Sequence, residues 1–349
     1  MQCFIKITKE KPYVAATGNT TSSGGYNSGA ITAPPPVLGK DYIWLDYGTN
    51  VPQINQVFTH WNHQSVVPNR GVTVRLTGAE QYTIGGSFQT LLFHEQAEFW
   101  KDAVLEPTVP TANNPFFVQD LPSYQIDRWL VVNGNAKWTD RITGCKFTSA
   151  TVSSTSEGAR APVSLTVNWQ GSTRVEIPVS PAFVAPVCTG DEIPKKPYRW
   201  NKSTLTLDTT GTTPINMDKI LRSWTIEIQH QMATRINKGA TVTSMVQTGW
   251  TPQLSAVWDI DSWDFKTKYQ DIIKGMDTVQ YPESTLVLLD TVKDPAKPGD
   301  TTFTFINLVI KSLADNLPVA DFATQNAVLQ PHFDCTKWDM KVAYKSVGA

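Results

Sequence analysis

The sequence predicts a mainly β (α+β) protein built from two similar units, each with one flanking helix. Three observations support this: strand-like segments of period two occur in both halves, a helix-like segment follows in each half, and a proline-rich stretch separates the halves. The 349 residues accommodate about two domains of ordinary size. Aromatic residues are plentiful and charged residues make up 17%, which suits a β-rich chain that buries surface against partners.

The two halves contain strand-like segments that match position for position. Residues 70–77 and residues 222–229 both carry apolar side chains at alternate positions, which predicts half-buried strands. The alternating positions are Val72, Val74 and Leu76 in the first half and Trp224, Ile226 and Ile228 in the second.

Each matched strand is followed by apolar residues at helical spacing, so one helix is expected per unit. These residues are Phe93, Ala97, Trp100 and Val104 in the first half and Phe265, Tyr269, Ile272 and Met276 in the second. Further strands are expected at 129–132, 145–153 and 163–169, and again at 286–289, 302–311 and 327–333.

The spacing between strand and helix differs between the halves. It is about twenty residues longer in the second half, and the additional residues fall at 233–250. This segment is expected to form a protruding hairpin with its turn near 237–239. The first half is instead longer after its helix, where 107–122 is expected to be a loop.

Composition divides the chain into five parts. Residues 1–39 are expected to be a flexible N-terminal arm, since 15–39 is rich in Gly, Ser, Thr and Pro. Prolines at 178, 181, 186, 194 and 197 predict an extended linker. The predicted parts are the arm (1–39), a first domain (40–177), the linker (178–200), a second domain (201–340) and a C-terminal tail (341–349).

Charge and cysteine usage limit the classes of function. The formal net charge is −1, so no sequence-wide basic surface exists and a dedicated nucleic-acid binder is not expected. The four cysteines are far apart and form no CxxC pair, which favours free thiols in a reducing compartment. The N-terminus lacks the apolar core of a signal peptide, and no apolar run reaches membrane-spanning length.

Motifs for catalysis or metal binding are weak. No GxSxG, GxxxxGK or HExxH motif occurs, so we expect no enzyme, no catalytic residue and no cofactor. His60 and His63, with His94 or His332, could form a metal site only after folding, and we expect none. The segment 259–264 resembles the start of a calcium loop, but it lacks that loop's glycine and final glutamate and suits a helix N-terminus better.

The tryptophans divide into two groups. Trp100, Trp169 and Trp224 lie on the apolar phase of their elements and are expected in the core. Four others have no clear phase and are candidates for interfaces. They are Trp44, Trp61, Trp250 and Trp338.

The order of strands and helix, together with the segments 144–154, 163–171 and 222–231, resembles the major tail tube proteins of long-tailed bacteriophages. The resemblance is one of pattern across 40–340. It implies β-sandwich or open-barrel tube domains, and duplicated members of the family close as trimeric, pseudo-hexameric rings that stack into a hollow tube. Strands of neighbouring subunits would form a continuous barrel around the lumen.

The resemblance implies a structural virion protein of the phage tail, assembled in the host cytoplasm. Its partners would be copies of itself, other tail proteins at the tube ends and passing DNA that is not read by sequence, with no membrane binding. The hairpin at 233–250 would contact the next ring, although the N-terminal arm is an alternative. The candidate contact residues are Arg235, Ile236, Lys238, Val242, Met245 and Val246.

A second hypothesis belongs to a different class. A two-domain β-sandwich module could bind carbohydrate or another ligand through exposed aromatic residues and the carboxylates of 259–264. Self-association discriminates the two hypotheses, because a tube subunit must bury surface against its own copies whereas a binding module can remain monomeric.

Overall fold

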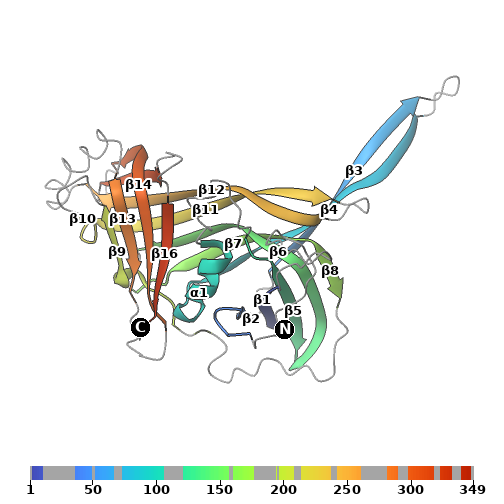
Figure 1. Cartoon of the computed structure of the whole chain (residues 1–349), viewed down its shortest axis with the longest axis horizontal. Coiled ribbons are helices and arrows are strands. Elements are labelled where there is room, and N and C mark those ends of the chain that lie inside the picture. The colour runs from blue at the N-terminus through green and yellow to red at the C-terminus, as the bar shows by residue number, and fades with distance from the viewer. Residues whose placement is uncertain are drawn as a thin grey trace, which may run out of the picture.

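The structure of the chain is a computed structural model (Figure 1). The structure describes residues 2–10, 36–48, 52–66, 73–105, 121–156, 160–176, 194, 196–207, 214–236, 242–260, 281–289, 298–317, 323–331 and 339–346. Antiparallel strands dominate these residues, which confirms the mainly β prediction.

The first unit contains eight strands and one short helical segment. Its strands are β1 (Gln2–Lys9), β2 (Tyr42–Gly48), β3 (Ile54–Val66), β4 (Thr73–Leu91), β5 (Tyr124–Val132), β6 (Asn135–Thr155), β7 (Ser164–Gly171) and β8 (Thr173–Glu176). Its helical segment runs through a 3-10 turn (His94–Gln96), α1 (Ala97–Trp100) and a π-helical turn (Lys101–Leu105).

The second unit contains eight strands in the same order. A 3-10 turn (Trp200–Lys202) leads into it. Its strands are β9 (Ser203–Leu207), β10 (Ile215–Asn216), β11 (Leu221–Ile236), β12 (Val242–Asp259), β13 (Tyr281–Leu288), β14 (Pro298–Asn316), β15 (Thr324–Pro331) and β16 (Asp339–Ser346). The helix expected around 265–276 lies outside the described residues.

The two units have the same strand pairing. The first has the order β2-β1-β5-β6-β7-β4-β3 with β8 on β6, and the second has β10-β9-β13-β14-β15-β12-β11 with β16 on β14. Both long strands that link the sheets, β6 and β14, carry a one-residue bulge, at Thr148 and at Lys311. The shared order and the shared bulge identify the units as two versions of one pattern.

The helical segment of the first unit packs into its core. Ala97, Trp100 and Val104 are buried as the spacing predicts. Phe93 instead pairs with Pro197 just before the helical turns begin. The Trp100 ring meets Phe147 of β6 edge-on, with 5.5 Å between the centroids. The helical segment therefore packs β6 against the core of the first unit.

The core contains the tryptophans expected there. Trp100, Trp169 and Trp224 are at most 3% exposed. Two residues considered for interfaces, Trp44 and Trp250, are also buried within the chain, so that interpretation is wrong for them. The Trp61 side chain and Trp338 lie outside the description.

The matching of the two halves was wrong by one strand. The counterpart of β11 is β3, whereas residues 70–77 lead into β4, which corresponds to β12. The second unit therefore has no twenty-residue insertion, because both units contain a long hairpin. Alternation of period two is common to every half-buried strand, so a short match cannot identify which strand it comes from.

Three predicted boundaries also differ from the structure. Residues 2–9 of the predicted arm form β1, which pairs with both β2 and β5. Tyr198 of the predicted linker is fully buried, and β16 occupies most of the predicted tail. Cys3, Ile5 and Ile7 alternate into the core, and this apolar alternation explains why β1 is a strand.

Candidate functional site

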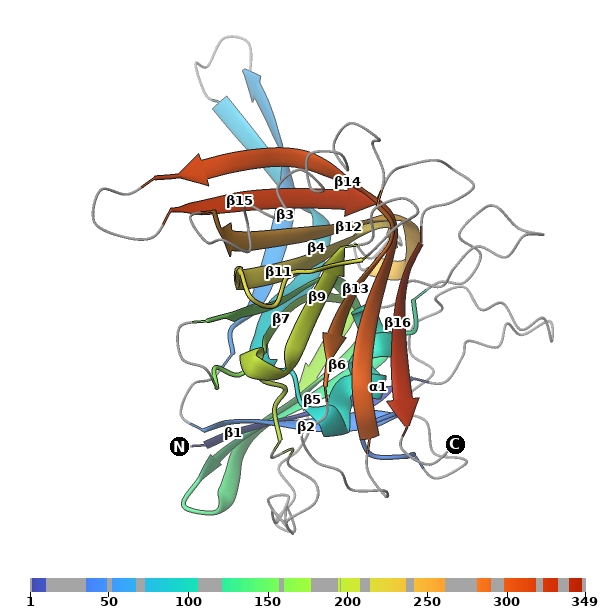
Figure 2. The ribbon, with the colours of Figure 1, turned by 90° about the vertical axis from the view of Figure 1, so that its left-hand side faces the viewer.

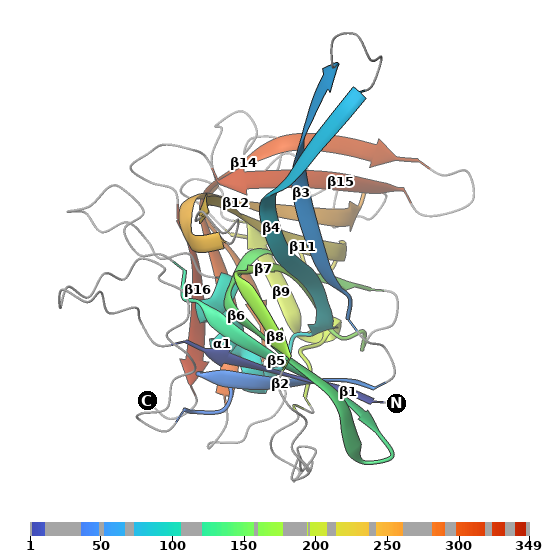
Figure 3. The ribbon, with the colours of Figure 1, turned by 90° about the vertical axis from the view of Figure 1, so that its right-hand side faces the viewer.

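One continuous eight-stranded sheet crosses both units. Its order is β3-β4-β7-β6-β11-β12-β15-β14, and every neighbouring pair is antiparallel. Figures 2 and 3 show β14, β15, β12 and β11 following one another across this sheet. Since each unit supplies four strands in the same order, the sheet repeats once along its width.

The two units meet at the pairing of β6 with β11, which we call the internal joint. Ser223 to Gln229 pair with Thr155 to Ser149, and Glu227 stands opposite Thr151. On one face of the joint Ile226 and Ile228 are fully buried in the core. The joint is therefore a regular part of the sheet.

Buried hydrogen bonds fix the second hairpin onto the first unit. The ammonium of Lys146, fully buried on β6, donates to the Met245 carbonyl oxygen at 2.6 Å. Nε2 of His230 lies 2.9 Å from the Val104 carbonyl oxygen, and Nδ1 lies 2.9 Å from Gln247 Nε2. Burial lowers the pKa of His230 to about 4, so the imidazole is neutral at physiological pH.

The sheet presents uncharged polar side chains on the face opposite the core, which we call the polar face. Serine, threonine, asparagine and glutamine predominate at alternate positions, half-buried or exposed, and Val257 and Val328 interrupt the pattern. The polar face includes Ser87 and Gln89 of β4, Ser149, Thr151 and Ser153 of β6, Ser164, Thr166 and Asn168 of β7, Thr225, Glu227 and Gln229 of β11, Gln253 and Ser255 of β12, and Asn326 and Gln330 of β15.

Hydrogen bonds link neighbours on the polar face. The hydroxyl oxygens of Ser153 and Ser164 are 2.8 Å apart, and Asn168 donates to the Ser149 hydroxyl at 2.7 Å. Among the described side chains of this face, few are charged. Glu227 lies near the centre of the face, and Lys311 lies in the bulge of β14 at its edge. The face therefore offers hydroxyl and amide groups with almost no net charge.

The start of β3 is held in place by a buried ion cluster. Arg128 pairs with Asp140 at 2.7 Å and donates to the Pro52 carbonyl oxygen at 3.3 Å. Arg174 contacts the same carboxylate at 2.7 Å. Pro52 lies two residues before β3, the edge strand of the sheet, so Arg128 helps to position that edge.

Beyond this point, the hairpin of β3 and β4 projects away from the body (Figure 1). The sequence predicts a protruding hairpin at 233–250, and the structure shows this kind of protrusion in the β3–β4 hairpin instead. That second hairpin does form, with β11 paired to β12 up to Ile236 and Val242.

The candidate inter-ring residues are distributed unevenly. Met245 is fully buried and receives the hydrogen bond from Lys146, so it offers no surface to another ring. Val246 is half-buried. Arg235 and Ile236 lie on β11 and Val242 on β12, but their side chains, and all of Lys238, are outside the description.

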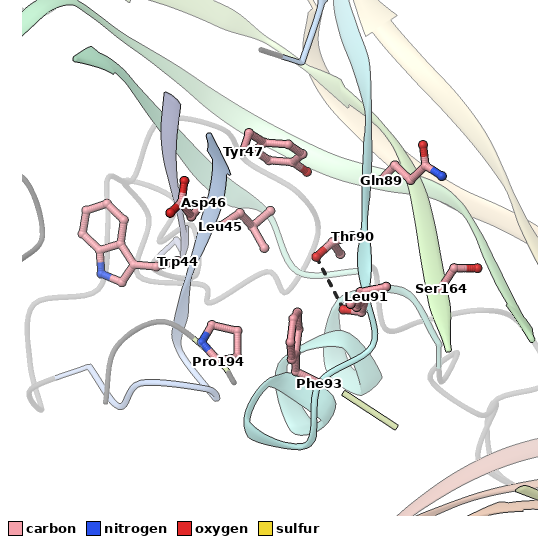
Figure 4. Close-up of a pocket in the computed structure, with 10 residues that line it drawn as sticks. All are labelled: Trp44, Leu45, Asp46, Tyr47, Gln89, Thr90, Leu91, Phe93, Ser164 and Pro194. Carbon is pink, nitrogen blue, oxygen red and sulfur yellow. Dashed lines mark hydrogen bonds between the residues drawn. The ribbon is translucent and has the colours of Figure 1, made fainter. Parts of the chain in front are cut away.

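A cavity of about 360 Å³ lies between β2 and the end of β4 (Figure 4). Leu45 and Tyr47 point from β2 toward β4, whereas Trp44 points away. Burial raises the pKa of the Tyr47 hydroxyl. Nothing in this cavity identifies a ligand, because its lining is largely apolar and carries no convergent charged groups.

The residues considered for metal binding do not form a cluster in the described part of the chain. His94 packs on the Tyr198 ring at 3.8 Å, and the Asp259 carboxylate pairs with Arg222 at 2.8 Å. His60 and His63 lie on β3 with undescribed side chains, while 261–264 and His332 are outside the description. Cys3 and Cys145 are free, buried thiols, as expected.

The described helical segments include none long and apolar enough to cross a membrane. No protein-family model and no curated protein matches the sequence. One solved chain that matches comes from the tail of an empty GTA particle, computed with helical refinement and C6 symmetry. It is 14% identical, aligns over 41% of this chain and 96% of its own length, and gives a TM-score of 0.27. At this level, the likeness assigns no function to this chain.

Proposed function

We propose that the chain is a structural subunit of a phage tail tube, which forms trimeric, pseudo-hexameric rings that stack around a DNA-conducting lumen. The observation that carries the proposal is the repeated eight-stranded sheet with a polar face that carries very few charges. Two equivalent units in one chain suit a ring in which each copy fills two equivalent places. We assign it no catalytic role.

The width of the sheet is compatible with a channel for DNA. Three copies would supply 24 strands, and a spacing of about 4.8 Å gives a barrel roughly 37 Å across, which strand tilt would widen. Side chains would occupy about 5 Å on each wall, which is half of the usual distance between packed sheets. The remaining opening admits a double helix.

The chemistry of the polar face suits the passage of DNA. A protein binds phosphates mainly by neutralising them with Lys and Arg, which releases counterions. A wall of hydroxyl and amide groups around Glu227 offers no such gain, so DNA would pass without being held. A lumen lined by arginine or lysine would retain it.

Electron microscopy of the purified protein in negative stain tests the proposal. Hollow rings or tubes with threefold or pseudo-sixfold symmetry are expected. Persistent monomers at high concentration, also in the presence of a tail extract that supplies initiating proteins, would contradict the proposal. That result would favour the alternative, a two-domain module that binds carbohydrate or another ligand.

A further inference from the structure

We propose that β3 of one copy pairs with the C-terminal half of β14 in the next copy, in the register that β11 and β6 adopt inside the chain. The ring in which this pairing closes rests on the proposed function. The register, however, follows from the chain itself. The partner is thus a second copy of this chain, joined by strand addition.

The repeated topology defines which residues are equivalent. The bulges at Thr148 and Lys311 align β6 with β14, so that Ser149 corresponds to Ser312 and Thr151 to Ala314. On the other side of the sheet, Asn55 corresponds to Glu227. Asn55 pairs with Gly85 of β4, and Glu227 pairs with the equivalent residue of β12.

Among the described strands, none pairs with the two outer edges of the eight-stranded sheet as β11 pairs with β6 at the internal joint. Residues 149–153 of β6 pair with β7 on one side and with β11 on the other. Residues 309–316 of β14 pair with β15 alone among the described strands, and β3 likewise pairs with β4 alone. Such edges are templates for pairing with another chain.

Transferring the internal joint onto these edges gives a specific register. Residues 53–57 of one copy would run antiparallel to residues 312–316 of the next, with Asn55 opposite Ala314 and Val57 opposite Ser312. In this register Asn55, Ser312 and Asn316 fall on one face with Val57 and Ala314, while Gln56 and Asp315 lie on the opposite face beside Ile54 and Leu313. The polar face therefore continues from copy to copy.

Apolar exposure at the two edges supports the pairing. Val57 and Leu317 are 54% and 69% exposed, although each adjoins the sheet. On the opposite face, Ile54 and Leu313 are only partly buried beside the core, whereas their counterparts Ile226 and Ala150 are completely or almost completely buried at the internal joint. A neighbouring strand at each edge would bury these apolar side chains, as the pairing of β6 with β11 buries Ile226 and Ala150.

The pairing is head-to-tail, because the two edges belong to different units. Such an interface cannot be completed by two copies, since each dimer leaves one β3 edge and one β14 edge open. It therefore propagates until a ring closes. Three copies would place six equivalent joints around the ring, three internal and three between copies.

Disulfide trapping tests the register. Directly opposed residues have Cα atoms about 4.5–5.5 Å apart, within disulfide range, whereas residues two positions away are about 7–8 Å apart. Asn55→Cys with Ala314→Cys should give disulfide-linked oligomers of increasing size on a non-reducing gel, up to the size of the closed ring. Asn55→Cys with Asn316→Cys is the shifted control, expected to give about ten-fold less product.

The chain supplies a positive control, and its own cysteines can be kept from forming competing disulfides. Thr151→Cys with Glu227→Cys forms the equivalent bond within one chain and should leave its size unchanged. The background carries Cys188→Ser and Cys335→Ser. Cys3 and Cys145 stay, since both are buried and burial raises their pKa values, to about 11 for Cys3.

A charge swap gives a second readout on exposed positions. Val57→Lys with Ser312→Lys places like charges opposite each other and should suppress rings, while Val57→Lys with Ser312→Glu should restore them. Rings without disulfide-linked oligomers from the first cysteine pair, or with such oligomers from the shifted pair, would overturn this register and leave the proposed function standing. A chain that forms no assembly in microscopy would overturn the proposed function and the joint together.

Discussion

His230 makes the stability of the internal joint sensitive to acid. Its imidazole is buried, with Nε2 directed at the Val104 carbonyl oxygen and Nδ1 at the Gln247 amide nitrogen. In this neutral form Nε2–H donates and Nδ1 accepts. Protonation would put a hydrogen on Nδ1, facing the donor of Gln247, and would leave a charge buried between the two units.

The size of the effect follows from the pKa. Burial lowers the pKa of His230 from 6.5 to about 4 in the folded chain. The unfolded chain therefore binds a proton below pH 6.5, which the folded chain takes up only near pH 4. The stabilisation that comes from keeping His230 neutral is complete above pH 6.5 and is lost as the pH falls toward 4, by about 1.4 kcal/mol per pH unit, so roughly 2–3 kcal/mol is lost by pH 4.5.

Urea unfolding of the wild type and of His230→Gln at pH 7.5 and pH 4.5 measures this contribution. Glutamine can still donate to the Val104 carbonyl oxygen but does not titrate. The wild type should lose roughly 2–3 kcal/mol more than the variant between the two pH values, since other titrating groups are common to both. Equal losses would refute the assignment of a buried neutral imidazole at the joint.

Three further predictions address the polar face, the core and the β3 edge. Thr151→Lys with Gln253→Lys should make assembled tubes retain duplex DNA in a salt-dependent manner, as measured by co-sedimentation at about 50 and 200 mM salt, whereas Thr151→Gln should not. Trp100→Ala should lower the free energy of unfolding by about 3–5 kcal/mol in urea titrations, because the indole is completely buried, and a loss below about 1 kcal/mol would contradict its place in the core. Arg128→Met should cost about 2 kcal/mol in the same titrations, because it removes two hydrogen bonds to the buried Asp140 carboxylate while Arg174 still pairs with it, and it should reduce ring yield in microscopy; unchanged stability and ring yield would contradict the role of Arg128 at the β3 edge.

Local patterns predicted most of the strands, because alternation between core and solvent is a property of each strand alone. Ile226 and Ile228 point inward as expected, and β5, β6 and β7 lie close to their predicted positions. Pairing could not be predicted in this way. The match of 70–77 to 222–229 joined strands that occupy different places in the sheet, since both satisfy the same alternation.

The polar face has a local signal in the sequence. Ser149, Thr151 and Ser153 alternate with buried residues, and Ser164, Thr166 and Asn168 do the same on the neighbouring strand. Alternation in which the outward residues are almost all uncharged differs from an ordinary solvent face, where Lys and Glu are common. Reading the outward positions as well as the inward ones would have pointed to this face.

The open edges have no comparable local signal, because an edge is defined by what does not pair with it. Residues 312–314 alternate much as 149–151 do, although Asp315 stands where Val152 is buried, yet among the described strands only 149–153 have a second neighbour. That difference emerges only when the two units are compared as paired sheets. The internal joint then serves as a template: a chain that contains one complete contact between units also carries both halves of the next, one at β3 and one at β14.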